Sequence, residues 1–313
     1  MFNLYINNFN ISINKLKAED FGESQGVLIK KFESDTDLFK IEPIIFLADP
    51  FLFSYNGRLY LFYERQDRWY GIGHICMRFT NDMQVWSDEI DVLKEAFHLS
   101  FPYVFEDNGK VYMLPEAGYS GTIRLYEACN DNLSKWKLSK VIIDEKRQWV
   151  DSSIIKKGAK YYLFTSVKEK EVFNQYLFVS DSLDGPYKEH PRSPIYTGND
   201  YGRNGGAVFS FNDRLYRPAQ ICVSSYGEDI TLMQIEQLTA EKYSEQVYKD
   251  RIYSTAFSDY NFGGHQFNIV SHNKELLMTI DYRVKNYNVI ELIRRITVSY
   301  THLRAHETLM NLV

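Results

Sequence analysis

The segment ADPFLFSYNGRLYLFYE (48–64) decides the fold, because it consists of two apolar strands joined by a tight turn. Asn56 and Gly57 at its centre supply the positive φ angles that a two-residue hairpin turn requires. The same pattern of a strand, a turn and a second strand rich in Tyr, Leu and Phe returns at 100–116, 150–166, 205–220 and 264–281. The chain is therefore built from repeats, and each of these five segments is predicted to be a β-hairpin.

The hairpin turns are evenly spaced along the chain. The second turn residue stands at 57, 109, 158, 213 and 274, so successive turns are 52, 49, 55 and 61 residues apart. Between hairpins, a third strand and a polar turn lead to an aromatic residue that opens a fourth strand: Trp86, Trp136, Tyr187 and Tyr243. Four strands in each of five repeats predict an all-β protein, a five-bladed β-propeller with four antiparallel strands per blade and little helix. Two stacked sandwiches are the alternative, but they do not explain why one pattern returns five times.

The repeat sets the expected domain boundaries. We expect a lead-in segment over 1–38 and the propeller over 39–297, with the extended segment Phe39 to Phe46 adding a strand to the last blade and closing the ring. Closure is needed because an open propeller leaves bare sheet edges. The last residues, 298–313, resemble the translation of a sequencing adapter and are excluded from the fold. On that reading the native C-terminus is missing, and with it the outermost strand of blade five.

The composition narrows the classes of function. The chain has 313 residues, 44% of them hydrophobic and 25% charged, and a net charge of -5, which is typical of a soluble globular protein. Mild acidity without a run of basic residues argues against nucleic acid or an anionic membrane as partner. No stretch of about 18 apolar residues is present to span a membrane. The N-terminus lacks the features of a signal peptide, so we expect a cytoplasmic protein.

Cysteine and histidine usage predicts neither a cofactor nor a metal site. Cys76, Cys129 and Cys222 lie too far apart for a disulfide framework or a Cys-x-x-Cys site. No other ligand spacing argues for a metal ion. A polar small molecule, such as a carbohydrate or another sugar-bearing ligand, is the expected partner.

Polar residues recur at fixed offsets from the hairpin turns. Seven residues after the second turn residue stand Glu64, Glu116, Thr165, Gln220 and Asp281. At the start of the first strands stand Asp49, Phe101, Asp151, Asn204 beside Arg203, and His265, and His98 lies just before blade two. In a propeller the first strand of each blade lines the central channel, so these residues are predicted to converge on one mouth of the channel.

Other residues near the same strand starts are aromatic, and stacking on a sugar face is one possible role for them. They are Phe101, Tyr103, Tyr119, Trp149 and Tyr201. Most aromatic side chains in a chain this rich in them are expected to be core. Each of the polar residues also has a structural alternative, as a strand cap or as the partner of an arginine.

Carboxylates at a channel mouth fit glycan chemistry for a physical reason. Cleavage of a glycosidic bond needs a carboxylic acid to protonate the leaving oxygen and a second carboxylate that activates water or attacks directly. Burial of one carboxyl group beside another raises its pKa and assigns it the acid role. The sequence supplies candidates for both groups.

The hairpins LADPFLFSYNGRLYLFYE, HLSFPYVFEDNGKVYMLPE and GRNGGAVFSFNDRLYRPAQ resemble the N-terminal domain of glucosamine inositolphosphorylceramide transferases. The resemblance covers roughly residues 40 to 295 and implies membership of the arabinanase, levansucrase and invertase superfamily of five-bladed propellers. That domain also occurs in bacterial proteins without the plant glycosyltransferase domain, and we expect this chain to be bacterial. Its transferase activity is not carried over to this chain.

The glycosidases of that superfamily imply roles for three carboxylates. An Asp that opens blade one acts as base or nucleophile, and Asp49 matches it; an Asp of a middle blade tunes the acid, and Asp151 matches it. The general-acid Glu has no counterpart, because the corresponding position in blade four reads Arg203-Asn204-Gly205-Gly206. Glu116 would have to act as the acid from a different blade, with Glu64 as the other substitute.

Three hypotheses follow for the function. The first is a glycoside hydrolase-like protein with Asp49, Glu116 and Asp151 as catalytic residues. Substrate-binding residues would be Glu64, His98, Phe101, Arg203, Asn204, Gln220, His265 and Asp281. The second is a noncatalytic glycan-binding module in bacterial surface-polysaccharide biosynthesis. The third is an activity other than hydrolysis on a nucleotide sugar or a lipid-linked sugar, with Arg203 binding phosphate.

Overall fold

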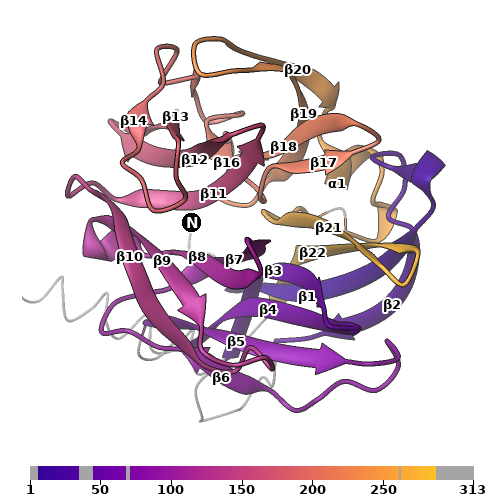
Figure 1. Ribbon diagram of the computed structural model, residues 1–313. Coiled ribbons are helices and arrows are strands. Elements are labelled where there is room, and N and C mark those ends of the chain that lie inside the picture. Colours follow the sequence, from indigo (N-terminus) through magenta and orange to yellow (C-terminus); the bar gives the residue numbers. More distant parts are fainter. Residues whose placement is uncertain (1–5, 35–44, 68–70, 261, 287–313) are drawn as a thin grey trace, which may run out of the picture.

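Five small antiparallel sheets form a ring in the computed structural model of the protein (Figure 1), which describes residues 6–34, 45–67, 71–260 and 262–286. In four of the sheets the first strand faces the middle of the ring and the later strands lie progressively outward, whereas in the fifth β21 lies innermost and β2 outermost. This is the predicted five-bladed β-propeller. Within these ranges, helix is confined to α1 (Ile252–Thr255) and three short 3-10 turns, η1 (Ala18–Asp20), η2 (Gly118–Ser120) and η3 (Ser258–Tyr260).

The first three blades follow the chain in order. Blade one contains β3 (Ile45–Tyr55), β4 (Arg58–Asp67), β5 (Gly73–Thr80) and β6 (Ile90–Leu93). Blade two contains β7 (Ser100–Asp107), β8 (Lys110–Glu116), β9 (Thr122–Ala128) and β10 (Trp136–Asp144). Blade three contains β11 (Trp149–Lys157), β12 (Lys160–Glu169), β13 (Val172–Ser180) and two short outer strands, β14 (Lys188–Glu189) and β15 (Tyr196–Thr197).

The last two blades depart from this order. The inner position of blade four is split between β16 (Arg203–Asn204) and β17 (Phe209–Phe211), which both pair with β18 (Arg214–Ile221) and are followed by β19 (Asp229–Leu238) and β20 (Tyr243–Lys249). Blade five combines β21 (Phe267–His272) and β22 (Glu275–Asn286) with two strands from the start of the chain, β1 (Ile6–Leu16) and β2 (Val27–Phe32).

The split in blade four has a steric cause. The amide of Gly205 bonds to the carbonyl oxygen of Pro218, and the carbonyl of Gly205 accepts from the amide of Phe267 in blade five, at 2.7 Å. A side chain on Gly206 would place its Cβ 2.0 Å from the carbonyl oxygen of Phe267. The two glycines therefore allow the close approach of blades four and five.

The hairpin turns form where the sequence predicts them, with one shift. In blades one, two, four and five, both turn residues have positive φ, as in the pair Asn56 at 48° and Gly57 at 76°. In blade three the turn is Gly158-Ala159, one residue later than predicted, because Lys157 pairs with Lys160 at the end of the ladder.

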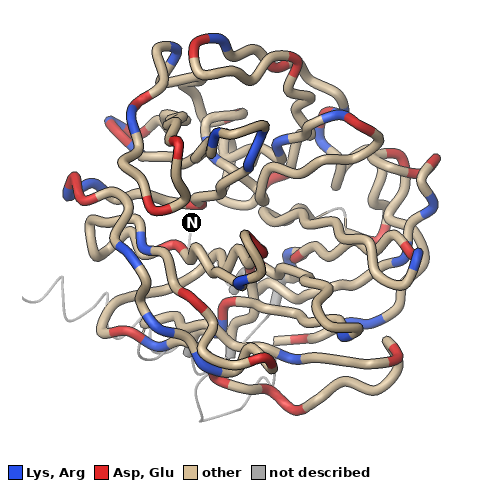
Figure 2. The backbone as a smooth tube through the Cα atoms, in the orientation of Figure 1, with Lys and Arg blue, Asp and Glu red and all other residues tan. Residues whose placement is uncertain are grey.

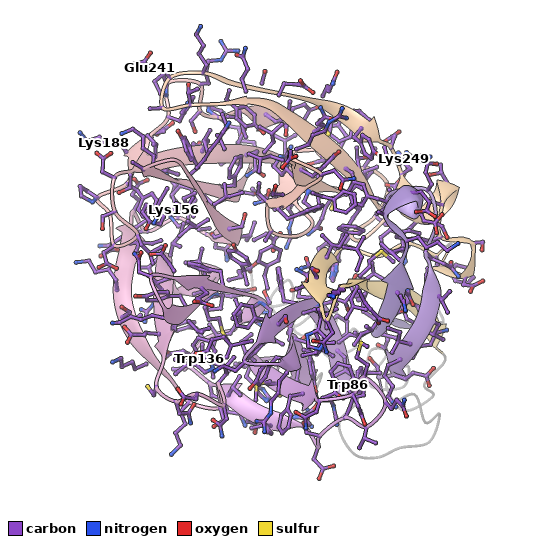
Figure 3. All side chains as sticks on the ribbon, turned by 45° about the vertical axis from the view of Figure 1, so that its right-hand side comes forward. Trp86, Trp136, Lys156, Lys188, Glu241 and Lys249 are labelled. Carbon is purple, nitrogen blue, oxygen red and sulfur yellow. The ribbon has the colours of Figure 1, made fainter. Side chains whose placement is uncertain are left out.

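The aromatic residues that were expected to open the outer strands do so in two blades. Trp136 opens β10 and Tyr243 opens β20, whereas Tyr187 precedes β14 by one residue. Trp86 stands outside β6 and makes an isolated bridge to Thr80. Figure 3 shows Trp86 and Trp136 near the periphery of the ring.

The hydrophobic core consists of seams between neighbouring blades, not of one central core. One cluster packs Phe62 and Met77 of blade one against Val104 and Met113 of blade two. Equivalent clusters join blades two and three, three and four, four and five, and five and one. Each blade therefore packs against a neighbouring blade on both of its faces, which explains why the hairpins are nearly continuously apolar.

The ring is closed by the first strand of the chain. β1 pairs with β22 in an unbroken antiparallel register from Ile6↔Asn286 to Leu16↔Leu276, and β2 pairs with the other edge of β1. The expectation of a lead-in segment over 1–38 is thus wrong in its most important part, because residues 6–32 supply half of blade five. The outer strands of that blade come from the N-terminus, so a lost C-terminal strand is not needed to explain it. Residues 39–44 and the tail 298–313 lie outside the described residues.

The interleaved asparagines of β1 explain why its role was missed. Phe9, Ile11 and Ile13 point to one side, but Asn8, Asn10, Ser12 and Asn14 on the other side are buried as well. Some of these polar groups have partners: Ser12 contacts Asn14 and the hydroxyl of Tyr260, and the Asn10 side chain accepts from the amide of Ser34. Oδ1 of Asn8 and Nδ2 of Asn14 have no hydrogen-bond partner among the described residues. The alternation of apolar and polar residues in β1 is typical of a half-exposed strand, but β1 is buried on both faces.

Charged residues are spread over the outer strands. Figure 2 shows Lys and Arg interspersed with Asp and Glu around the ring, with neither kind gathered in one region of this view. No helix within the described parts of the chain is long and apolar enough to cross a membrane.

A plug interrupts the central channel. Phe51, Phe101 and Ala207, from three different blades, form a small buried cluster, with the two phenyl rings 4.9 Å apart. On the side away from the strand starts lies a cavity of about 370 Å³ that is lined by inner strands of all five blades. The plug therefore forms the floor beneath the polar mouth.

Closure by β1 generates a stability prediction. Ile13 is fully buried in the seam between blades five and one, so Ile13→Ala is expected to lower the free energy of unfolding by about 2–5 kcal/mol. Val27→Ala, on β2 of the same blade with Val27 72% exposed, is the matched control and is expected to change it by less than about 0.5 kcal/mol. Urea denaturation of both variants measures the difference. Equal, small effects would contradict the closure by β1.

Candidate functional site

Three blades begin with the same unusual backbone. Asp49, Phe101 and Asp151 have φ angles of 51°, 45° and 50°, and at each of them the ladder with the second strand is interrupted by a register shift. A left-handed conformation is tolerated by Asp and is costly for Phe. The bulge turns the backbone away from its own blade, so the groups of these residues meet the neighbouring blades.

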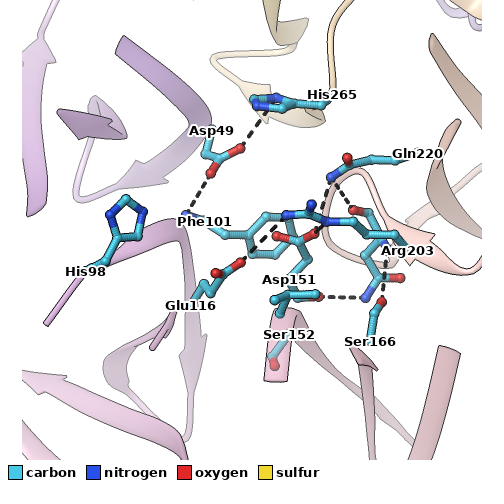
Figure 4. A network of polar contacts seen from close by, with 12 residues as sticks. Asp49, His98, Phe101, Glu116, Asp151, Ser152, Ser166, Arg203, Gln220 and His265 are labelled. Atoms are coloured by element: carbon cyan, nitrogen blue, oxygen red, sulfur yellow. Dashed lines mark hydrogen bonds and ion pairs between the residues drawn. The ribbon is translucent and has the colours of Figure 1, made fainter. Parts of the chain in front are cut away.

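Asp49 joins blades one, two and five. One carboxylate oxygen accepts a hydrogen bond from the amide of Phe101 at 3.1 Å, and the other lies 3.6 Å from Nδ1 of His265 (Figure 4). The amide of Asp49 donates to the Asp281 carboxylate at 3.2 Å. Asp281 also accepts from the amides of His265 and Gln266, at 2.8 and 3.1 Å, and forms an ion pair with the His265 ring.

Burial and crowding change the protonation of this group. Burial raises the pKa of Asp49 from 3.8 to about 7 against the attraction of His265, and the charges of Glu64, Asp151 and Asp281 add to the rise. Burial lowers the pKa of His265, but the charges of Asp281 and Asp49 outweigh it and raise that pKa from 6.5 to about 9. The imidazole is therefore cationic at neutral pH, and it neutralises part of the charge on the two aspartates.

Arg203 joins blades two, three and four. Its Nε forms an ion pair with Oδ2 of Asp151, and its Nη2 lies 3.8 Å from Oε2 of Glu116. The guanidinium also lies 5.1 Å from the ring of Tyr226 and 5.3 Å from the ring of Phe173. Burial and the nearby charge of Asp151 raise the pKa of Glu116 well above its ordinary value, although Arg203 opposes the rise.

Buried amides and hydroxyls hold Asp151 and Arg203 in place. Gln220 donates to the Asp151 carboxylate at 3.2 Å and to the carbonyl of Asn204 at 2.8 Å, while the Asn204 side chain donates to the carbonyl of Asp151 at 2.7 Å. The hydroxyl of Ser166 accepts from the Asn204 amide at 3.3 Å, and Ser152 bonds to Thr165 at 2.8 Å. The contacts from Gln220 and Asn204 to Asp151, and from Asn204 to Ser166, join blade three to blade four.

Glu64 and His98 form a third pair, between blades one and two. Nε2 of His98 lies 3.2 Å from Oε1 of Glu64, and Nδ1 accepts from the amide of Gly73 at 2.9 Å. Burial lowers the pKa of His98, but the hydrogen bond and charge of Glu64 outweigh it, so the net shift is upward.

Exposure separates residues that can touch a ligand from those that support them. The side chains of His98, Arg203 and Glu116 are 19%, 13% and 11% exposed. Asp49 and Glu64 retain 8% and 7%. The remaining predicted residues, with 2% or less, position their neighbours: Asp151, Asn204, Gln220, His265 and Asp281.

The structure brings all the predicted polar site residues to one mouth, but it corrects the role of several aromatic residues. Phe101 is fully buried in the plug, so the structure contradicts its prediction as a substrate-binding side chain; only its amide takes part in the mouth. Trp149 is buried against Tyr176 and Phe178, and Tyr103 lines the cavity beyond the plug, where its hydroxyl donates to the carbonyl of Ile154. Tyr119, 70% exposed, remains available to a ligand.

The sequence interpretation missed Tyr226. Its ring lies 4.9 Å from the ring of His265 and beside Arg203, and the residue is 49% exposed. It stands in the loop between the second and third strands of blade four, and Tyr119 stands in the corresponding loop of blade two. Both tyrosines therefore occupy the same position in the repeat, the loop between the second and third strands of a blade. The offsets counted from the hairpin turns did not extend to this loop.

Among the residues that the structure describes, two groups of side chains have donor atoms close enough to share a metal ion. One consists of Asp49, His265 and Asp281 at the mouth, and the other of His74, Cys76 and Asp91 on the outer strands of blade one. At the mouth, a protonated imidazole between two carboxylates already accounts for the arrangement. On blade one, Asp91 forms an ion pair with Lys94 at 2.5 Å. Burial raises the pKa of the Cys76 thiol far above its ordinary value. The Asp91 carboxylate and the Cys76 thiol therefore have structural roles.

Comparison with known proteins identifies the family. The profile of the family "Glucosamine inositolphosphorylceramide transferase 1, N-terminal" matches residues 34–274. The chain belongs to this family. The resemblance inferred from the hairpins is thereby confirmed, although the match ends before residue 295.

The curated relatives are plant proteins. Glucosamine inositolphosphorylceramide transferase 1 of Arabidopsis thaliana is 40% identical over 210 residues, which are 65% of this chain and 27% of that protein. The protein of the same name from Oryza sativa subsp. indica is 37% identical over 213 residues, 65% of this chain and 28% of that protein. The chain thus spans about a quarter of the length of these relatives. Their plant origin overturns the expectation of a bacterial protein.

Solved structures with the same fold are glycoside hydrolases. A family 117 glycoside hydrolase of Zobellia galactanivorans has a TM-score of 0.54 and 15% identity, with 92% of each chain covered. An α-L-arabinofuranosidase of Podospora anserina has a TM-score of 0.55 and 11% identity, covering 75% of this chain and 90% of that one. At this identity the likeness shows the fold alone, and the family and fold together make the protein a glycan-related propeller.

The buried His265 pair predicts how stability depends on pH. The folded protein holds a proton on His265 up to a pKa of about 9, against 6.5 ordinarily, so this stabilisation is complete below pH 6.5 and is lost as the pH rises through about 9. The raised pKa of Asp49 acts in the same direction, since stability falls as the pH rises from 3.8 through about 7. We therefore expect a lower melting temperature at pH 9 than at pH 6.

Thermal unfolding followed by circular dichroism between pH 6 and 9 measures this dependence. His265→Gln should remove most of it, on the order of 2 kcal/mol across this range. His190→Gln, which changes another buried histidine away from the mouth, should retain it. A melting temperature that is constant or rises with pH in the parent protein would contradict the assignment of a cationic His265.

Proposed function

We propose that the mouth of the propeller binds a sugar-bearing ligand without cleaving it. The observation that supports this is that each mouth carboxylate lies beside a cationic or protonatable side chain. Asp49 and Asp281 face His265, Glu64 faces His98, and Asp151 and Glu116 face Arg203. Cleavage of a glycosidic bond needs one protonated and one free carboxyl group on either side of the bond.

Arg203 of blade four is the reason why the pairing of carboxylates with cations argues against cleavage. Arg203 stands where the resemblance to superfamily glycosidases places the general-acid Glu, and its guanidinium forms the ion pair with the aspartate that would tune that acid. A carboxylic acid at this place would donate a proton, whereas an arginine stays charged and donates hydrogen bonds. The mouth is therefore arranged to hold polar groups of a ligand.

Hydrolysis is the second candidate, and one observation favours it. The pKa of Asp49 is raised to about 7 and that of Glu116 is raised well above its ordinary value, both chiefly by burial. A raised pKa is what a general acid requires at neutral pH. In this alternative Glu116 is the acid, Asp49 is the base or nucleophile, and Asp151 orients the acid.

The variant Asp49→Asn distinguishes a binding module from a hydrolase. Binding of cello-, xylo-, arabino- and chito-oligosaccharides is measured by calorimetry, and their cleavage by release of reducing ends. For a binding module we expect affinity without cleavage in the parent, and loss of affinity by about tenfold or more in Asp49→Asn, because the charge facing His265 is removed.

For a hydrolase, Asp49→Asn would abolish cleavage and spare binding. Asp91→Asn, at a carboxylate 48% exposed on the outer face of blade one, is the control and should leave binding unchanged. Cleavage by the parent that Asp49→Asn abolishes would overturn the proposal, and so would the absence of any binding.

A further inference from the structure

The loop that carries Tyr226 is held by an arginine of blade five. Nη1 of Arg283 donates to the hydroxyl of Ser225 at 3.1 Å and to the carbonyl of Tyr226 at 3.4 Å. Its Nε donates to the carbonyl of Phe262 at 2.7 Å. One guanidinium therefore joins the loop of blade four to the segment that precedes β21, and its fixed fork of N–H donors suits this bridging role.

The two segments that Arg283 joins also lie against each other. The amide of Arg283 donates to the carbonyl of Gly263 at 2.7 Å. A side chain on Gly263 would place its Cβ 2.6 Å from the carbonyl oxygen of Gly227. The loop is therefore packed on blade five, which fixes the backbone of Tyr226 although 49% of that residue is exposed.

Phe9 of β1 supports the same loop from within the fold. Its ring stacks on the imidazole of His265, with centroids 4.2 Å apart and planes 10° apart, and it meets the ring of Tyr226 edge-on at 6.2 Å. A Cβ on Gly227 would lie 3.0 Å from Cζ of Phe9. A cationic imidazole is attracted to the face of an aromatic ring. Phe9, which is 4% exposed, thus holds two rings of the mouth in place.

The two supporting residues face each other across the strands that close the ring. Phe9 of β1 and Arg283 of β22 are partners in the register of this ladder. The family profile matches residues 34–274, so both of them lie outside the matched region. The strand pair that closes the propeller therefore also supports one edge of the mouth.

We propose that Tyr226 contacts the sugar-bearing ligand and that Arg283, together with Phe9, positions it. This inference rests on the proposed function and names a contact that determines its affinity. The ring of Tyr226 lies 5.1 Å from the guanidinium of Arg203, whose side chain is 13% exposed. An amphipathic ring beside a charged donor is an arrangement that holds a polar ligand in one orientation. Arg283 is a positioning residue, because it acts through the loop and not through the ligand.

A double-mutant cycle on binding tests the proposal. The probe is whichever of the cello-, xylo-, arabino- and chito-oligosaccharides binds the parent protein most tightly by calorimetry. Tyr226→Ala and Arg283→Met are each expected to weaken binding by about tenfold. The double variant should bind within about twofold of Tyr226→Ala alone, because Arg283 has no other route to the ligand. A residue that only stabilised the fold would not show this coupling.

Two further variants separate positioning from a general effect of removing an arginine. Arg214→Met removes another arginine, which donates to Gln234 at 3.4 Å on blade four, and should keep the affinity within about twofold. Arg283→Lys keeps the charge but loses the fork of donors, and should weaken binding by about threefold. The melting temperature of each variant shows that it is folded, and Arg283→Lys replaces Arg283→Met in the cycle if the latter is not.

The outcomes distinguish this inference from the function beneath it. If none of the oligosaccharides binds, the proposed sugar recognition fails and the inference fails with it. If the parent binds and Tyr226→Ala binds equally well, sugar recognition stands and the contact with Tyr226 is wrong. Losses that multiply in the double variant, or an unchanged affinity in the Arg283 variants, would overturn the positioning role of Arg283.

Discussion

The pairing of β1 with β22 is the constraint on which the rest of the structure depends, because it joins the two ends of the described chain in one blade. Closure brings Asp281 of blade five to the backbone of Asp49 in blade one. From there the contacts continue through Phe101 of blade two, and through Glu116, Asp151 and Arg203 to blade four. The polar mouth is thus a circuit of contacts across all five blades, which exists only in the closed ring.

The circuit also explains why buried charges are tolerated at the mouth. A lone buried carboxylate is costly, and the cost falls when a cation and hydrogen-bond donors surround it. His265 and Arg203 supply those cations: His265 faces Asp281 of its own blade and Asp49 of blade one, and Arg203 faces Asp151 of blade three. The result is a set of buried carboxyl groups that is held in place by contacts between the blades.

The sequence predicts the hairpins and the meeting of polar residues well, because turn residues and strand periodicity are local signals. Asn56-Gly57 dictates its turn wherever the blade lies, and the fixed offsets place Glu116 and Asp281 correctly. What it does not predict depends on contacts distant in sequence. The asparagines of β1 are buried by blades far along the chain, Phe101 is buried by Phe51 and Ala207, and Tyr226 acquires its role only beside Arg203 and His265.

The central claim is that Arg203 neutralises Asp151 across the boundary of blades three and four. A double-mutant cycle of Arg203→Met and Asp151→Asn, followed by urea denaturation, measures this interaction most directly. We predict that Arg203→Met alone costs about 3–5 kcal/mol, because it leaves Asp151 buried and unpaired. The double variant should then be more stable than the sum of the single effects by on the order of 2 kcal/mol. Single effects that add within about 0.5 kcal/mol would contradict the account.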